Sequence, residues 1–172
     1  YYLTLEKPGE AGEGKVFRDV DEAMMAYNEH IIGLHAHIKV RMTKTVNGES
    51  VSRLVDTTLG KIIFNTPVPQ DLGFVDRSDP DNMFRLEVEG LVTKKVLGKI
   101  IDRCIRIHGT AKTSEVLDAI KNQGYRFSTR SGITVAVCDA TIPPRKKEIL
   151  DNTERMVDSI DRKYRRGLLS NQ

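Results

Sequence analysis

The sequence predicts an α+β fold with a small antiparallel sheet, a helix pair, a buried strand and a long C-terminal helix. Three observations lead to this prediction. Apolar and polar residues alternate from Leu34 to Met42, which is the period of a strand with one buried face. Between Thr93 and Gly124 apolar residues recur at helical spacing instead. After Pro144 they form one stripe along a highly charged segment, which indicates a helix.

The first predicted helix begins near Asp19. Glu22 follows Asp19 at the spacing of a capping box, so the Asp19 carboxylate is expected to cap the helix. Helical spacing then continues at four apolar residues, Ala23, Met24, Tyr27 and Ile31. Before this helix, the short apolar run 1–5 fits the end of a helix or strand begun upstream, and residues 8–14 form a glycine-rich loop.

The predicted sheet follows this helix. Strand 34–42 leads through the turn dipeptide Asn47-Gly48 to a second strand, 51–55, so a hairpin is expected. Residues 57–65 are interpreted as a third extended run. The polar, turn-rich segment 76–82 then closes this part of the chain.

Alternation and helix signals continue after this boundary. Residues 84–89 alternate between apolar and charged side chains, which predicts an edge strand or an extended arm. Thr93 is a candidate N-cap for a helix that Gly109 ends, and Thr113 caps a second helix that Gly124 ends. These two helices are the predicted pair.

The stretch 124–150 joins the helix pair to the last helix. Ile133, Val135 and Val137 alternate with smaller or polar residues, which predicts a largely buried strand. Pro143 and Pro144 end it and favour the first turn of a helix, which continues to about residue 166 with a coiled-coil-like apolar seam. We therefore divide the chain into three segments, namely 1–75, 76–142 and 143–172.

Composition excludes several classes of protein. The 27 basic residues exceed the 24 acidic ones by only three, so the charge balance does not demand nucleic acid or an anionic membrane as a partner. Without CxxC spacing, Cys104 and Cys138 are interpreted as reduced core thiols. No apolar run approaches the roughly 18 residues that span a bilayer, and no targeting pattern begins the chain, so a cytoplasmic protein is expected.

Two short patterns raise chemical alternatives. His35 and His37 share one face of the predicted strand, a spacing that binds zinc if a third ligand converges. Ser131 stands in a turn between Arg130 and Gly132, but it lacks the surroundings of an activated nucleophile, and a turn serine is the preferred interpretation. We predict no catalytic, cofactor-binding or metal-binding residue in this chain.

The run TRSGITVAVCD followed by IPPRKKEIL resembles the β′, or largest, subunit of bacterial multisubunit RNA polymerase. Further blocks agree in order along nearly the whole chain, namely YYLTLEK, GEGKVF, LHAHIKVR, DTTLGKIIFN, LGKIIDRC and YRRGL. The resemblance implies a piece of a longer subunit, and the start without Met agrees with this expectation. The segments would be the pore-domain sheet and helix (1–75), the helix pair and strand of the secondary-channel region (76–142) and the first rim helix of the funnel (143–172).

The resemblance also implies a role in DNA-templated transcription. In that family the secondary channel admits nucleoside triphosphates and receives the 3′ end of the transcript. Expected partners are the β, α, ω and sigma subunits, transcript-cleavage factors and other factors of this channel, and DNA and RNA through the complex. The family motif that holds catalytic Mg²⁺, Asn-Ala-Asp-Phe-Asp-Gly-Asp, is missing from this sequence. Mg²⁺ and structural Zn²⁺ are therefore expected elsewhere in the subunit, and this piece alone is expected to be inactive.

Six residues around the joining stretch are candidates for lining that channel. Five of them are basic, and basic side chains raise the local concentration of polyanions. They are Arg126, Arg130, Ser131, Arg145, Lys146 and Lys147. Two other interpretations stay open. The chain is alternatively an interaction module whose exposed charged helix docks a partner coiled coil, or a zinc enzyme built on the two histidines.

Overall fold

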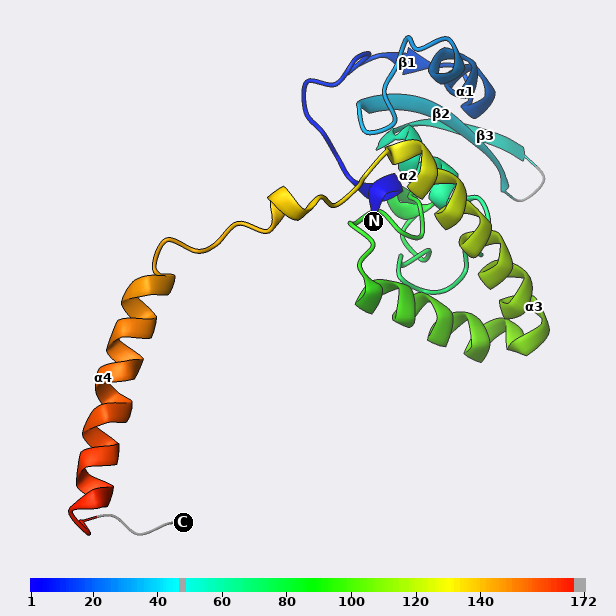
Figure 1. Ribbon diagram of the computed structural model, residues 1–172. Coiled ribbons are helices and arrows are strands. Elements are labelled where there is room, and N and C mark those ends of the chain that lie inside the picture. The colour runs from blue at the N-terminus through cyan, green and yellow to red at the C-terminus, as the bar shows by residue number, and fades with distance from the viewer. Residues whose placement is uncertain (47–48, 169–172) are drawn as a thin grey trace. The chain divides into compact units, whose positions relative to one another are not determined.

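The computed structural model describes residues 1–46 and 49–168 and confirms the α+β class (Figure 1). The chain forms two compact units, Tyr1–Ile133 and Thr134–Gln172, each of which is described by itself. The predicted three-part division stays a prediction.

The first unit contains a three-stranded mixed sheet, which lies at its top in the view of Figure 1. Its order is β1 (Val16–Phe17), β2 (His37–Val46) and β3 (Glu49–Thr58), with β1 parallel to β2 and β2 antiparallel to β3. The predicted hairpin is therefore confirmed, although its turn dipeptide lies outside the described residues. The two-residue strand β1 adds a parallel neighbour, so the sheet is mixed rather than purely antiparallel.

Helix α1 (Val20–Asn28) packs on this sheet. The Asp19 carboxylate accepts a hydrogen bond from the Glu22 N–H at 2.8 Å, which confirms the predicted cap. Ala23 of α1 and Ile38 and Val40 of β2 are fully buried in one cluster with Leu59. This cluster is the core between the sheet and the helices.

The prediction of a third extended run was wrong. Residues Leu59–Asn65 form helix α2, and the Thr58 hydroxyl caps it by accepting a hydrogen bond from the Lys61 N–H at 3.3 Å. Short apolar runs do not distinguish a buried strand from a buried helix, and here the cap decides between them.

Residues 84–89 were predicted to be an edge strand or an extended arm, and the edge strand was wrong. After the short helix η2 (Pro80–Asn82), Phe84, Leu86 and Val88 are buried as their alternation predicted, but within the described residues they pair with no strand. The Asn65 side chain instead bonds the Val88 backbone, donating to its carbonyl at 2.7 Å and accepting from its N–H at 3.0 Å. One buried amide thus satisfies the backbone groups that a neighbouring strand would have satisfied.

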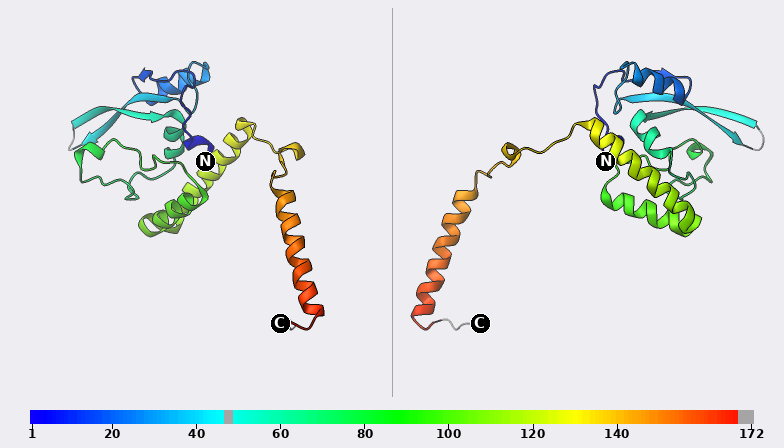
Figure 2. Two further views of the ribbon diagram at one scale, coloured as in Figure 1. Left: turned by 90° about the vertical axis from the view of Figure 1, so that its left-hand side faces the viewer. Right: turned by 45° about the vertical axis from the view of Figure 1, so that its right-hand side comes forward.

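The predicted helix pair is one element, α3 (Lys94–Ser131), bent at Gly109 into a first arm, 94–108, and a second arm, 110–131 (Figure 2). Thr93 occupies the N-cap position, as predicted. Gly109 ends the first arm, as predicted, because its backbone is not helical. The bounds of the second helix differ. Thr113 is a buried helical residue whose hydroxyl donates to the Gly109 carbonyl at 2.7 Å, so it is not a cap. Gly124 does not end the helix, which continues to a left-handed C-cap at Gly132.

The bend requires glycine at position 109. Gly109 has φ 73° and ψ −178°, a region that only glycine adopts without strain. We expect Gly109→Ala to lower the free energy of unfolding by about 1–3 kcal/mol. Gly98→Ala, at an open helical position of the first arm, should instead raise it by up to about 1 kcal/mol. Urea unfolding of the two variants measures both changes, and the same sign for both would contradict a bend fixed by Gly109.

The prediction of a buried strand after residue 132 was wrong. Val135 and Val137 are 87% and 95% exposed, and the segment contains only a short turn of helix η3 (Val137–Asp139). The described part of the second unit holds no strand to accept hydrogen bonds from this segment, and a single strand is unstable in water. The segment after residue 132 therefore has strand propensity, but the described part of the second unit has no strand with which it could pair.

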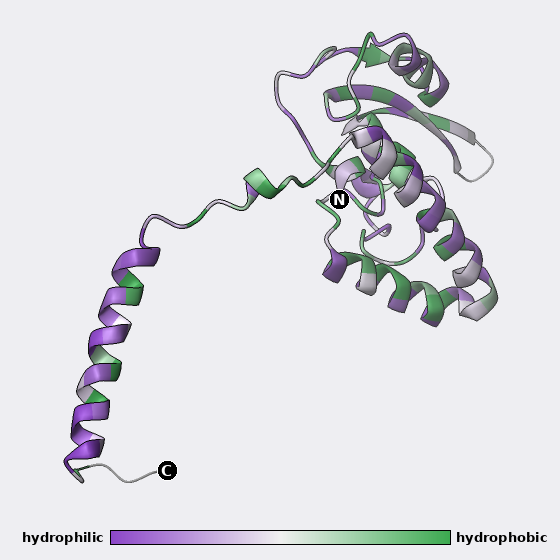
Figure 3. Cartoon of the chain, in the orientation of Figure 1, coloured by the Kyte–Doolittle hydropathy of each residue, from purple (hydrophilic) through white to green (hydrophobic). Residues whose placement is uncertain are grey.

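The predicted C-terminal helix is confirmed as α4 (Lys146–Arg165). All of its residues are exposed, and its hydrophobic residues, green in Figure 3, recur along the helix among hydrophilic ones. They are Ile149, Leu150, Met156, Val157, Ile160 and Tyr164. The periodicity predicted this stripe correctly.

Cys104 is buried in the first unit and Cys138 is exposed in the second, and both are free. The prediction of two core thiols was therefore right for Cys104 and wrong for Cys138. Within residues 1–46 and 49–168, no helix combines the length and the hydropathy needed to cross a membrane.

Candidate functional site

The structure places three of the six predicted channel residues at the end of the second arm of α3. Arg126, Arg130 and Ser131 lie within its last two turns. The other three belong to the second unit, where Arg145 is the N-cap of α4 and Lys146 and Lys147 form its first turn. Each group is considered in its own unit.

A hollow of about 220 Å³ brings Arg126 and Arg130 together with residues of α1 and α2. We call it the arginine hollow. Three amide side chains, Asn28, Asn122 and Gln123, share it with the two arginines. Its remaining wall consists of Met24, Tyr27, Ile63, Ala119 and Phe127. The hollow therefore combines two positively charged side chains and three amides with a mostly apolar lining.

Helical geometry explains why these polar groups share one side of the arm. Asn122, Arg126 and Arg130 follow one another at a spacing of four residues, which places them in one row on the helix surface. Two cations at this spacing repel each other at a cost of about 0.2–0.5 kcal/mol. The row is therefore slightly unfavourable for the helix by itself, and an anion bound between the two guanidinium groups would relieve the repulsion.

Aromatic rings support both guanidinium groups. The Cζ atom of Arg130 lies 5.3 Å from the centroid of the Tyr27 ring and 5.8 Å from that of Phe127. The Cζ atom of Arg126 lies 5.8 Å from the same Phe127 ring. Such contacts contribute about 0.5–1 kcal/mol at exposed sites and leave the N–H groups able to donate. Arg130 also stands in the last turn of α3, where the helix dipole favours a cation.

The charges of these arginines are not neutralised. Within the described ranges, no carboxylate lies within 4.0 Å of either guanidinium group. Two lysines of the same arm are paired instead, Lys112 with Glu115 at 2.8 Å and Lys121 with Asp118 at 2.7 Å. The hydrogen bond that the Lys121 ammonium group donates to the Asp118 carboxylate raises the pKa of Lys121 above its ordinary value. The arm therefore pairs its lysines and leaves its arginines available.

Contacts with α2 fix the position of the second arm. The Gln123 amide donates to the Ile63 carbonyl at 2.8 Å, and Phe127 is 5% exposed in a cluster with Phe64. These contacts hold the second arm on the core and thereby fix the backbone positions of its arginines.

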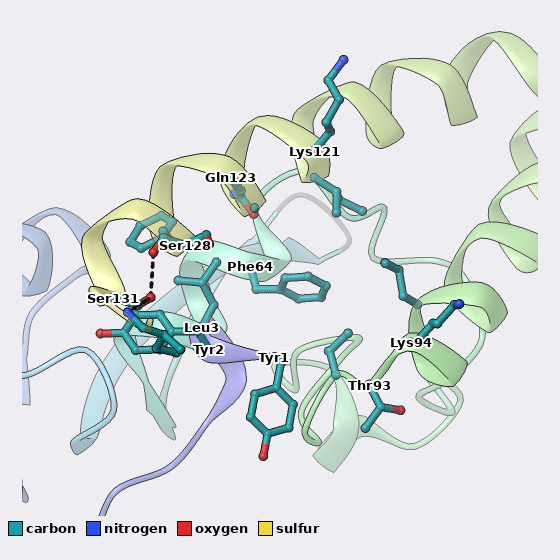
Figure 4. Close-up of a pocket in the computed structure, with 16 residues that line it drawn as sticks. Tyr1, Tyr2, Leu3, Phe64, Thr93, Lys94, Lys121, Gln123, Ser128 and Ser131 are labelled. Carbon is teal, nitrogen blue, oxygen red and sulfur yellow. Dashed lines mark hydrogen bonds between the residues drawn. The ribbon is translucent and has the colours of Figure 1, made fainter. Parts of the chain in front are cut away.

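Ser131 acts as a turn residue. Its hydroxyl donates to the Ser128 carbonyl at 2.7 Å and accepts from the Ile133 N–H at 3.4 Å (Figure 4). This agrees with the preferred interpretation of a serine that bonds local backbone. Within the described part of the chain, its hydrogen bonds are to backbone groups and not to a basic side chain that would activate a nucleophile.

The two histidines do not share a polar strand face. His35 precedes β2 and is buried, with its Nδ1 atom 3.1 Å from the Leu5 carbonyl oxygen. His37 lies instead between the carboxylates of Glu6 and Asp56, at 3.3 Å and 3.7 Å. Among the residues that the structure describes, no group of three or more His, Cys, Asp or Glu side chains is arranged to hold a metal ion.

In the second unit, the start of α4 carries an unfavourable charge pattern. Arg145, Lys146 and Lys147 stand at a helix N-terminus, where the helix dipole disfavours each cation by about 0.3–1 kcal/mol at low salt. Among the described residues, Arg145 pairs with the Glu148 carboxylate at 3.4 Å, and no carboxylate pairs with Lys146 or Lys147. These three residues form a second group of basic side chains, at the start of α4.

Sequence reasoning found the arginines of the hollow and missed its other polar members. Asn122 could have been predicted from the sequence, because it precedes Arg126 by one helical turn. Tyr27 and Asn28 come from α1, about a hundred residues earlier, and no local pattern connects them with the arginines. Only the packing of α3 against α1 does so.

Comparisons with known proteins agree with the resemblance seen in the sequence. Residues 1–140 match the family model described as RNA polymerase Rpb1, domain 3. The chain is 54% identical over 172 residues to the DNA-directed RNA polymerase subunit beta′ of Caldicellulosiruptor saccharolyticus, covering 100% of this chain and 15% of that protein. The corresponding protein of Clostridium novyi is 54% identical over 170 residues, covering 99% of this chain and 14% of that protein. That of Acetivibrio thermocellus is 51% identical over 172 residues, with 100% and 15% covered. The chain thus spans about 15% of the length of these relatives.

Proposed function

The chain belongs to the RNA polymerase Rpb1 domain 3 family, in the form found in bacterial β′ subunits, and from this premise we propose that it lines the secondary channel of a bacterial RNA polymerase. Its role there is to shape the route by which nucleoside triphosphates reach the active site and by which the transcript 3′ end is extruded. Its contribution is architectural and electrostatic.

The arginine hollow is the observation that supports this role. Arg126 and Arg130 are exposed, unpaired within the described residues and held against aromatic rings, with amide donors beside them. A triphosphate carries several negative charges and many acceptor oxygens, and paired guanidinium groups are well suited to bind such groups. A positive wall raises the local concentration of such anions, and salt weakens the effect.

Nucleotidyl transfer itself would depend on parts of the subunit outside this sequence. The Mg²⁺-binding motif of the family does not occur here, so we propose that the isolated chain has no polymerase activity. Mg²⁺ and structural Zn²⁺ would be bound elsewhere in β′. The proposed partners are the β, α, ω and sigma subunits, with DNA and RNA bound by the assembled enzyme in the bacterial cytoplasm.

A second candidate function rests on α4. Its apolar stripe is exposed and flanked by charged residues of both signs, which is the pattern of a helix that pairs with another helix. As a rim helix it would dock transcript-cleavage factors and other coiled-coil regulators. This role is compatible with the first one, because α4 and the arginine hollow belong to different units.

Neutralising the arginine hollow tests the proposal. We expect the double variant Arg126→Gln and Arg130→Gln, in assembled polymerase, to raise the apparent KM for nucleoside triphosphates by about two- to fivefold at low salt. The kcat should be nearly unchanged, because the groups act before the chemical step. Steady-state transcription at varied substrate concentration measures both, and the difference should shrink as salt shortens the Debye length.

The paired lysines of the same arm provide a matched control. Lys112→Gln with Lys121→Gln removes the same formal charge from groups that carboxylates already neutralise. Their expected KM stays within error of the unmodified enzyme. An unchanged KM in the arginine variant, or an equal rise in the lysine variant, would remove the proposed role of the hollow.

A further inference from the structure

The sheet has one buried face and one exposed face. Side chains alternate between the two faces along each strand, and residues directly opposite each other on neighbouring strands share a face. Phe17 of β1 is directly opposite Val40 of β2, and both are buried. The other face consists of exposed residues, which are Lys39, Arg41 and Thr43 on β2 and Ser52, Leu54 and Asp56 on β3, with Val16 on β1. We call it the outer sheet face.

Two apolar side chains lie among the polar ones on this face. Val16 of β1 is directly opposite Lys39 and is 58% exposed. Leu54 of β3 is directly opposite Arg41 and is 46% exposed. Removing such side chains from water is favourable. A partner that covers the outer sheet face would therefore gain apolar contacts beside two cations.

The two cations of this face have no counter-charge among the described side chains. No Asp or Glu oxygen in that part of the chain lies within 4.0 Å of the charged group of Lys39 or Arg41. Asp56 is directly opposite Lys39, but its carboxylate lies 3.7 Å from the His37 imidazole instead. Because Lys39 and Arg41 share a face two positions apart, their charges repel each other. A carboxylate supplied by a partner would attract both.

The composition of the outer sheet face favours a protein partner over a nucleic acid. Proteins that bind single strands stack the bases on aromatic rings, and the described part of this face has no Phe, Tyr or Trp. Its imidazole, that of His37, lies 3.3 Å from the Glu6 carboxylate and 3.7 Å from that of Asp56, and these carboxylates would repel phosphates. A second copy of the chain also fits poorly, because the same unpaired cations would face each other.

We propose that the outer sheet face binds a protein surface that presents aspartate or glutamate side chains to Lys39 and Arg41 and apolar side chains to Val16 and Leu54. Specific protein interfaces combine apolar contacts with complementary charges in this way. The partner surface belongs to the assembled polymerase and lies outside this chain. The inference rests on the proposed function only for this setting, because none of these four residues lines the arginine hollow.

Zero-length cross-linking of the assembled polymerase tests the proposal. A carbodiimide joins a lysine amine to a carboxylate where the two groups are in contact, and peptide mapping identifies the pair. We expect Lys39 to couple to an aspartate or glutamate outside residues 1–172. Lys99 is the matched control, because it is also exposed, has no carboxylate within 4.0 Å among the described side chains, and lies on the first arm of α3. Its coupling should be much weaker.

Variants of Arg41 show whether the partner surface is acidic. Arg41→Glu should lower the yield of Lys39 coupling about fivefold, because a carboxylate there repels those of the partner. Arg41→Lys keeps the charge and should retain the yield. If Arg41→Glu prevents assembly, Arg41→Gln repeats the measurement, with an expected loss of about twofold.

Four results would overturn the inference: coupling of Lys39 to Asp56 alone, a yield no higher than that of Lys99, equal yields in the variants that keep and lose the Arg41 charge, or coupling that appears only after nucleic acid is removed. The last result would assign the face to phosphates. The KM measurement on the arginine hollow does not involve this face. A raised KM without coupling of Lys39 would therefore keep the proposed function and reject only the partner of the sheet.

Discussion

Replacing Glu87 with alanine is expected to lower the free energy of unfolding of the chain by about 3–5 kcal/mol. The Glu87 side chain is fully buried. Its carboxylate accepts the Phe74 N–H at 2.5 Å and pairs with the Arg77 guanidinium group at 3.1 Å. Alanine would leave a partly buried cation and a backbone donor without their acceptor, and removing one partner of a buried pair costs far more than the pair contributes.

The effect is large because the same cluster holds the segment between α2 and α3. The Arg77 guanidinium group also donates to the carbonyls of Asn82, Met83 and Arg85, at 2.9, 3.0 and 2.8 Å. The Lys44 ammonium group donates to the Met83 carbonyl as well, at 2.7 Å. Burial, and then the nearby Arg77, lower the pKa of Lys44, whereas Glu87 opposes this shift. Without Glu87, two neighbouring cations would lack their counter-charge.

Urea unfolding of the purified chain measures this change. Glu89→Ala is the matched control, because Glu89 pairs with Arg85 in a half-exposed position and should contribute much less than the buried Glu87. Glu87→Gln should lie between the two, since it retains an acceptor for the Phe74 N–H and loses the charge. Equal stability of Glu87→Ala and Glu89→Ala would show that the buried cluster is not a stabilising centre.

Cap residues and regular periodicity predicted the local structure well. Asp19 and Thr93 occupy the N-cap positions expected of them, the alternation of β2 buries Ile38 and Val40, and the stripe of α4 is helical. These features depend only on side chains within one turn or one strand of each other. A local pattern therefore contains all the information that they need.

The failures concern segments whose hydrogen-bond partners lie far away in sequence. Residues 133–138 have strand propensity, but a strand requires a neighbouring edge, and the described part of the second unit offers none. Val88 shows the reverse case, because the side chain of Asn65 replaces the expected edge. The arginine hollow follows the same rule. Its arginines were predictable, while Tyr27 and Asn28 depend on packing between α1 and α3.

The second large effect is expected at Phe127, which connects the core to the arginine hollow. Phe127 is 5% exposed, belongs to the core cluster and has both guanidinium groups near its ring. We expect Phe127→Ala to lower the free energy of unfolding by about 3–5 kcal/mol, because it leaves a cavity beneath the second arm of α3. Phe127→Leu should cost less, about 1–2 kcal/mol, because it fills most of that space. Urea unfolding measures both.

The leucine variant also separates packing from electrostatics at the site. It retains an apolar core residue but removes the ring that supports Arg126 and Arg130. If the ring orients the guanidinium groups, assembled polymerase with Phe127→Leu should show part of the KM increase expected of the arginine double variant, with an unchanged kcat. An unchanged KM would mean that Phe127 serves the core alone and that Tyr27 is sufficient to hold Arg130, because its ring lies nearer to that guanidinium group, at 5.3 Å.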